Sequence, residues 1–161
     1  MPQVVRPAAP GGFEVKRFTG IGFSLAIPRG WTQAVAYPPM VAVRTSDRAV
    51  IALWRYPSSR PAPHTAAQLR QADRRLLAAA RARDRTLRLI NSSTTSVAGY
   101  PAIEFQTVQR IGHQVREVAS THLFRPGEEL VLEEYSPPNL FAGLDRSVFS
   151  PVRRSLTALS R

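Results

Sequence analysis

Alternation of hydrophobic and polar positions with a period of two marks the first half of the chain. Phe23, Leu25 and Ile27 alternate with smaller residues, which predicts a half-buried strand. The stretch 28–30 (Pro-Arg-Gly) then predicts a tight turn, because proline presets the turn backbone and glycine suits its last position. Trp31 begins the next extended segment, and we expect its ring to close one end of the core.

Two further strands are expected at 40–45 and 49–56, separated by a turn. The second has apolar residues on both faces, which is typical of an interior strand covered on two sides. Four consecutive strands with short connections are expected later in the chain, and such a series favours an antiparallel meander. We place these four strands within 86–100, 101–112, 113–124 and 128–136.

A long helix is predicted at about 65–83. Thr65 and Gln68 have the spacing of a capping box, in which a hydroxyl and an amide satisfy free N–H groups at the helix start. Five residues fall within an arc of about 100° and form the expected core-facing stripe. They are Leu69, Ala72, Leu76, Ala79 and Ala80.

The C-terminal part predicts a loop or single turn at 137–145, followed by a last helix. This helix should be built on Phe149, Val152, Leu156 and Leu159, with a start or kink at Pro151, because proline fits the first helical position.

The order of strands, helix, meander and helix indicates an α+β fold in which helices flank a central antiparallel sheet, an α/β/α sandwich. Its expected core includes Trp31, Leu69, Leu76, Phe105 and Leu156. The length of 161 residues suits one domain, which we place at 13–161. Residues 1–12 are rich in Pro and lack the apolar segment of a signal peptide, so we expect a disordered leader or tether there.

The charge of the chain is uneven. The formal net charge is +11, and residues 1–88 hold 15 basic and 4 acidic residues, whereas residues 89–161 hold 7 of each. On the predicted helix and just after it, Arg70, Arg74, Arg81 and Arg85 lie within an arc of about 60°. This arginine cluster is the candidate binding face for an anion or a partner. A solvated surface without a function is the alternative interpretation.

The sequence shows no recognisable catalytic constellation. It contains no cysteine, which excludes disulfides, thiolate zinc sites and cysteine nucleophiles. The nucleophile elbow, the phosphate-binding loop and the His-Glu-x-x-His pattern are all absent. We therefore expect no catalytic residues, no cofactor and no enzymatic activity.

The histidines and acids of the chain do not have the spacing of a metal site or a catalytic pair. His64, His113 and His122 are spread over a loop and a strand, and we expect no metal site. The four acids Glu128, Glu129, Glu133 and Glu134 are expected to be solvated turn residues that pair with arginines, rather than paired catalytic carboxylates.

The order of three segments resembles the PsbP-like superfamily, which includes an extrinsic photosystem II protein, a regulator of the Ran GTPase, and bacterial secreted proteins and lipoproteins. The segments are a strand leading into "PRGW" at 28–31, "GYPA" at 99–102 before a strand, and a last strand that continues into a terminal helix ending near Leu156. The resemblance implies an antiparallel sheet sandwiched by helices and carries no catalytic set.

Three functions remain open. The first is a non-enzymatic PsbP-like binding or assembly module, secreted or in the cell envelope after leader removal, whose arginine cluster meets an acidic protein, lipid head group or polymer. The second is a cytoplasmic regulator or adaptor that binds a protein partner, and the third is a small hydrolase. Nucleic acid is disfavoured because no aromatic residues interleave with the arginines. No apolar run approaches the roughly 18 residues of a membrane-spanning helix.

Overall fold

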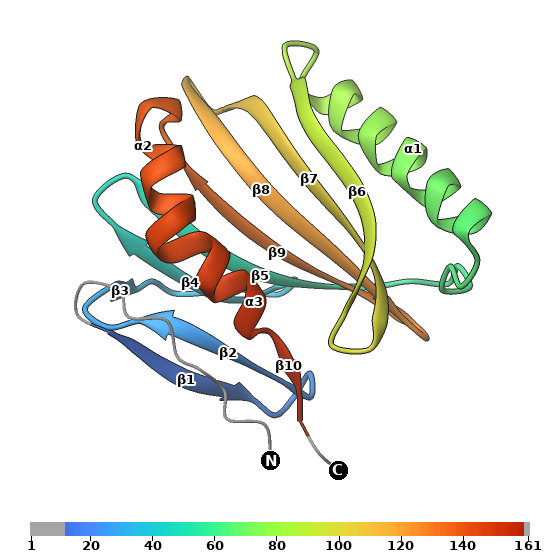
Figure 1. The fold of residues 1–161 in the computed structure, drawn as a ribbon, viewed down its shortest axis with the longest axis horizontal. Helices are drawn as coiled ribbons and strands as arrows, with labels where there is room; N and C mark the ends of the chain where they lie inside the picture. Colours follow the sequence, from blue (N-terminus) through green and yellow to red (C-terminus); the bar gives the residue numbers. More distant parts are fainter. Residues whose placement is uncertain (1–11, 160–161) are drawn as a thin grey trace.

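Two antiparallel sheets and a set of helices make up residues 12–159, the part of the chain that the computed structural model describes (Figure 1). The larger sheet contains, in spatial order, β3 (Thr32–Gln33), β4 (Met40–Ser46), β5 (Ala49–Pro57), β9 (Glu128–Ser136), β8 (Gln114–Arg125), β7 (Tyr100–Ile111) and β6 (Arg88–Val97). The smaller sheet contains β1 (Phe13–Phe18), β2 (Phe23–Pro28) and β10 (Thr157–Ala158).

The predicted strands are confirmed. β5 lies between β4 and β9, and its residues Ile51, Ala52 and Leu53 are each 2% exposed although successive side chains point to opposite faces. β6 to β9 form the expected meander. Its tight turns use Gly112 and Gly127, which have φ angles of +62° and +80° that only glycine adopts without strain.

The long helix α1 (Ala66–Arg83) begins where the sequence predicts. The hydroxyl of Thr65 accepts from the N–H of Gln68 at 3.1 Å, and Oε1 of Gln68 accepts in return from the N–H of Thr65 at 3.3 Å, so the capping box is formed. The helix ends at Arg83 because Asp84 has an extended backbone.

The C-terminal prediction is partly wrong. Residues 138–155 are helical throughout: α2 (Pro138–Leu144), the five-residue π turn η1 (Asp145–Phe149) and α3 (Ser150–Ser155) follow one another without a loop. The expected loop at 137–145 is absent because Pro138 starts a helix that buries Phe141 in the core. The expected irregularity near Pro151 occurs as the π turn just before it.

The last helix is also shorter than expected. Leu156 has an extended backbone, and the chain then pairs with β2 as β10, with Thr157 opposite Ser24. Leu156 and Leu159 therefore lie beyond the helix. Pairing with β2 replaces the intrahelical hydrogen bonds that a longer helix would have made.

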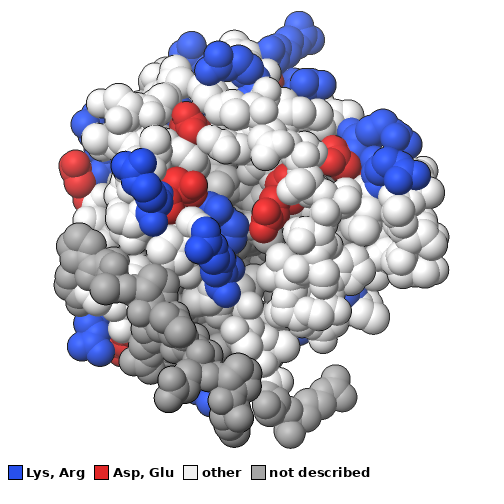
Figure 2. Space-filling view, viewed as in Figure 1, with Lys and Arg blue, Asp and Glu red and all other residues white. Residues whose placement is uncertain are grey.

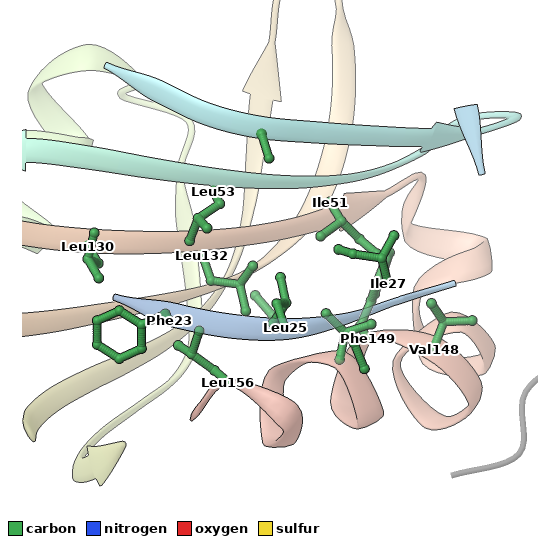
Figure 3. Packing of buried hydrophobic residues seen from close by; sticks show 14 of the residues in the cluster. Phe23, Leu25, Ile27, Ile51, Leu53, Leu130, Leu132, Val148, Phe149 and Leu156 are labelled. Atoms are coloured by element: carbon green, nitrogen blue, oxygen red, sulfur yellow. The ribbon is translucent and has the colours of Figure 1, made fainter. Parts of the chain in front are cut away.

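The main core lies between the large sheet, the small sheet and the α2–η1–α3 run (Figure 3). It includes Phe23 and Leu25 of β2, Leu132 of β9, and Phe149 and Val152 of the helices, all at most 1% exposed. Three layers therefore share one apolar interior, and β2 contributes the strand that the alternation predicts.

A smaller cluster lies on the opposite face of the large sheet, under α1. It contains Ala72 of α1 and Ile103, Phe105 and Phe124 of the sheet. α1 and the α2–η1–α3 run thus cover opposite faces, as Figure 1 shows. The α+β fold with helices flanking an antiparallel sheet is confirmed.

The core expectation holds for Phe105 and Leu156, each 6% exposed. It holds less fully for Trp31, Leu69 and Leu76, which are half-buried: Trp31 packs against the main core, and Leu69 and Leu76 pack against the cluster under α1. Ala72 is the one residue of α1 that is fully buried.

The helix stripe is also rotated slightly from the prediction. Leu77 packs against the cluster under α1, whereas Ala79 is exposed.

The predicted tether, residues 1–12, lies outside the described residues apart from Gly12. Within residues 12–159, no helix has both the length and the apolar character needed to cross a bilayer.

Candidate functional site

Three of the four arginines singled out in the sequence lie on α1. Arg70, Arg74 and Arg81 are exposed on the helix, and Arg85 is exposed two residues beyond its end. The predicted helical arc therefore does not extend to Arg85, because Asp84 has an extended backbone. We call these four residues the arginine face. Figure 2 shows basic side chains gathered at the top and right of the molecule, where α1 lies in Figure 1.

The acids that neighbour the arginine face in sequence direct their hydrogen bonds to other groups. Asp73 accepts a hydrogen bond from the hydroxyl of Ser92 on β6, so it faces the sheet. Asp84 accepts from the Thr86 hydroxyl at 2.5 Å and from the N–H of Arg110 at 2.7 Å, and these bonds lower its pKa below the ordinary value. Among residues 12–159, none of the four arginines forms an ion pair with an acid.

A second candidate site, not predicted from the sequence, is a groove between the α2–η1–α3 run and strands β6 to β8. It consists of three adjoining hollows with volumes of about 120, 440 and 410 Å³. Glu104 and Gln106 of β7 lie on the sheet side, and Asp145, Arg153 and Arg154 lie on the helical side. Figure 2 shows both acidic and basic side chains around the hollow in the middle of the view.

Arg153, which lines this groove, joins the helical side to the large sheet at β9. Its Nε donates to Oε1 of Glu134 at 3.1 Å, and its Nη2 donates to Oδ1 of Asp145 at 2.5 Å. The π turn contains Asp145 and directly precedes the helix that carries Arg153. One guanidinium therefore holds the last helix against β9 and also holds the π turn.

The charges in this network shift the pKa values of both partners. Complete burial raises the pKa of Glu134 well above 4.5, because Arg153 compensates only in part and because Asp145 and Glu104 add negative charge nearby. Burial by itself lowers the pKa of Arg153, but the negative charges of Glu134 and Asp145 outweigh this effect. The pKa of Arg153 is therefore raised above its ordinary value. The second oxygen of Glu134, Oε2, is buried without a hydrogen-bond partner among the described residues.

The expectation that the four glutamates are solvated turn acids paired with arginines is wrong, because all four belong to strand β9 and none is exposed; the pairing with arginine holds for Glu128 and Glu134. Glu134 is fully buried, and burial raises the pKa of the half-buried Glu133. Glu128 does pair with arginines, namely Arg55 and Arg125, and Glu129 instead contacts His122.

The sequence did contain a signal for Glu134. In β9, the residues Leu130, Leu132, Glu134 and Ser136 share one face by the period of two, and all four are buried. A glutamate on the apolar face of a strand indicates a buried charge that needs a basic partner. The identity of that partner, Arg153, depends on how the last helix packs.

The histidines do not converge. His64 is exposed before α1, and His113 lies in the turn between β7 and β8 rather than on a strand. His122 contacts Glu129 through Nδ1 at 2.6 Å on the face of the sheet that α1 covers. Within residues 12–159, no three His, Asp or Glu side chains are grouped so that they could hold a metal ion.

Comparisons with known proteins show the fold. Cyanobacterial PsbP of Synechocystis is similar to this chain with a TM-score of 0.68 and 15% identity, over 94% of this chain and 95% of that one. PA94 of Pseudomonas aeruginosa, a protein of unknown function, has a TM-score of 0.61 and 14% identity over 92% and 99% of the two chains.

LpqN, involved in cell envelope biogenesis of Mycobacterium tuberculosis, has a TM-score of 0.56 and 13% identity over 94% of this chain and 86% of LpqN. No family model matches the sequence, and no curated protein matches it. The chain therefore has a PsbP-like fold, as its sequence resemblance indicates.

Proposed function

We propose that this chain is a non-catalytic binding or assembly module of the bacterial cell envelope that contacts an acidic protein surface through the arginine face. Two similarities support the general role. The fold is that of PsbP, and LpqN, a protein involved in cell envelope biogenesis, shares it. Neither similarity names a partner, so the partner class rests on the surface of α1.

The observation that carries the proposal is that the acids beside the arginine face form hydrogen bonds with other groups and not with the arginines. Asp73 and Asp84 use their oxygens on Ser92, Thr86 and the backbone of Arg110. None of the four guanidinium groups forms an ion pair among residues 12–159, so their hydrogen-bond donors remain for a partner. Arginine binds carboxylates in a planar, bidentate way, which suits an acidic protein surface.

The rest of the exposed helix surface favours the same partner. Between the arginines, α1 exposes alanine and glutamine, such as Ala67, Gln71 and Ala78. These side chains offer no aromatic ring on which nucleic acid bases could stack. They also offer no large apolar side chain that could enter a lipid bilayer, as amphipathic membrane-binding helices do.

The test compares the wild type with a variant that carries glutamine at Arg70, Arg74, Arg81 and Arg85. Poly-glutamate serves as the probe of an acidic protein surface, and anionic vesicles and duplex DNA are the other two ligands, each at two salt concentrations. We expect poly-glutamate to bind the wild type and the variant to lose at least tenfold in affinity.

The matched control has glutamine at four exposed arginines elsewhere, Arg17, Arg48, Arg146 and Arg154, and thus has the same net charge. Equal binding by the two variants would contradict the proposal, because total charge would then explain the result. Preferential binding of vesicles or DNA would assign the arginine face to lipid or nucleic acid instead.

Location is tested separately, by fractionating cells that express the full-length gene product. Recovery with the envelope or periplasm is the expected result. Recovery in the cytosol would contradict the envelope location and favour the alternative of a cytoplasmic regulator or adaptor.

A further inference from the structure

A separate pocket lies at the start of α1, and its lining includes no residue of the arginine face or of the groove. It has a volume of about 240 Å³ and is formed by the loop after β5, the first turns of α1, and the ends of β8 and β9. The N–H of Ser58 donates to the carbonyl of Gly127 at 2.9 Å, which ties the loop to the turn between β8 and β9. The walls of the pocket are therefore joined to one another.

The one acid of this pocket is already neutralised. Glu128 has a side chain that is 10% exposed, and it pairs with Arg55 through one oxygen and with Arg125 through the other. Two arginines on one carboxylate leave this trio with a net positive charge. Glu128 thus cannot offset any further arginine that lines the pocket.

Two further arginines line the pocket, Arg60 from the loop and Arg75 from α1. Within residues 12–159, neither forms an ion pair. Arg75 is half-buried, whereas its neighbour Arg74 is exposed on the arginine face. The two guanidinium groups come from separate elements and retain their donors for a ligand.

Two polar side chains beside these arginines already use their acceptor oxygens. Oε1 of Gln68 accepts from the N–H groups of His64 and Thr65, so only the amide donors of Gln68 remain. The hydroxyl oxygen of Ser58 accepts from the N–H of Arg60 at 3.2 Å. The capping box also occupies part of the first N–H groups of α1. The positive character of the pocket therefore comes from the arginine side chains.

The remaining lining is apolar. Pro61, Ala62 and Pro63 of the loop, Ala72 of α1 and Phe124 of β8 line the same pocket. Ala72 and Phe124 are buried at 1% and 5% exposure and belong to the cluster under α1, so this part of the lining is held by packing. A ligand that fits here combines an anionic head with a small apolar body.

We propose that this pocket binds a small organic anion, whose phosphate or carboxylate head meets Arg60 and Arg75 and whose apolar body lies against Pro61 and Ala62. The volume is below the roughly 300–1,000 Å³ of sites for drug-sized molecules, so the ligand is small. Charge-assisted, bidentate hydrogen bonds to arginine supply the recognition of the head.

The experiment titrates the 161-residue chain with phenyl phosphate, benzoate and inorganic phosphate and follows its backbone amide resonances by NMR. Phenyl phosphate should shift the amides of Ala62, Gln71 and Ala72 and bind at least tenfold more tightly than inorganic phosphate, which lacks the apolar body. A comparison of phenyl phosphate with benzoate then tells which head the pocket prefers.

The Arg60→Gln and Arg75→Gln variants should each weaken phenyl phosphate binding at least fivefold, and the control Arg70→Gln on the arginine face should leave it unchanged. Equal affinity of all three variants for phenyl phosphate would overturn the proposal. So would chemical-shift changes at amides of the arginine face in place of those of the pocket. Because Arg60 is exposed in a loop, its substitution preserves the fold, and the amide spectrum checks this directly. Loss of poly-glutamate binding by the variant of the arginine face tests the proposed function independently.

Discussion

Arg153 of α3 donates to Glu134 of β9 at 3.1 Å, and of the two partners it is the glutamate that has no exposed surface. The arginine side chain keeps 18% of its surface exposed at the groove and also holds Asp145. Glu134, a carboxylate buried in the main core, is therefore paired through one of its two oxygens with a side chain of the last helix. This contact joins the centre of the large sheet to the C-terminal end of the fold.

Replacing Arg153 with methionine should destabilise the protein by roughly 3–5 kcal/mol, because Glu134 would stay buried without a charged partner. Urea denaturation gives the free energy of unfolding. Arg154→Met is the matched control, since Arg154 is the exposed neighbour, and it should change stability by less than about 0.5 kcal/mol. Equal effects of the two substitutions would show that the buried pair contributes nothing specific.

Stability should fall as the pH rises above the ordinary pKa of Glu134. The raised pKa means that the folded state holds this proton more tightly than the unfolded state does. The stabilisation is therefore fully present below about pH 4.5 and is lost as the pH rises toward the folded-state pKa. Glu134→Gln removes this titration, so the variant should gain stability relative to the wild type across that range.

The measurement is urea denaturation of both proteins from pH 4 to pH 8. Glu14→Gln serves as the control, because Lys16 lowers the pKa of the exposed Glu14 and its titration has the opposite sign. A wild type that gains stability relative to Glu134→Gln with rising pH would contradict the assignment.

Two leucine truncations should differ in how much they lower the free energy of unfolding, because one leucine is fully buried in the main core and the other is half-buried under α1. Leu132→Ala in the main core should cost roughly 2–5 kcal/mol, since Leu132 is 1% exposed. Leu76→Ala under α1 should cost less than half of that, because Leu76 is only half-buried. Equal shifts in the denaturation midpoint would show that α1 packs as tightly as the main core.

The capping box should contribute about 1 kcal/mol. Thr65→Ala removes the hydroxyl that accepts from Gln68 at 3.1 Å and leaves an N–H of the helix start without that partner. Ser59→Ala in the preceding exposed loop is the matched control and should have little effect. Helix content by circular dichroism and the unfolding midpoint together detect the loss. A midpoint unchanged by Thr65→Ala would mean that water replaces the cap at no cost.

Local patterns in the sequence were sufficient for α1, for β2 and for the main strands of the large sheet, but not for β1, α2 and β10. The period of two predicts β2 and β5, and the spacing of Thr65 and Gln68 predicts the start of α1, because these signals depend only on neighbouring residues. The consecutive strands and short turns likewise predict the meander. The arginine face is also a local property, since its members on α1 follow the helical period.

Tertiary structure decided the features that depend on distant partners. Leu156 and the residues after it could continue a helix by local pattern, yet they turn to extend the small sheet at β2. Asp73 could neutralise neighbouring arginines, but the position of β6 provides Ser92 instead. Glu134 finds Arg153 across 19 positions of the sequence. In each case two conformations or partners have similar local energies, and only the packing of the folded chain separates them.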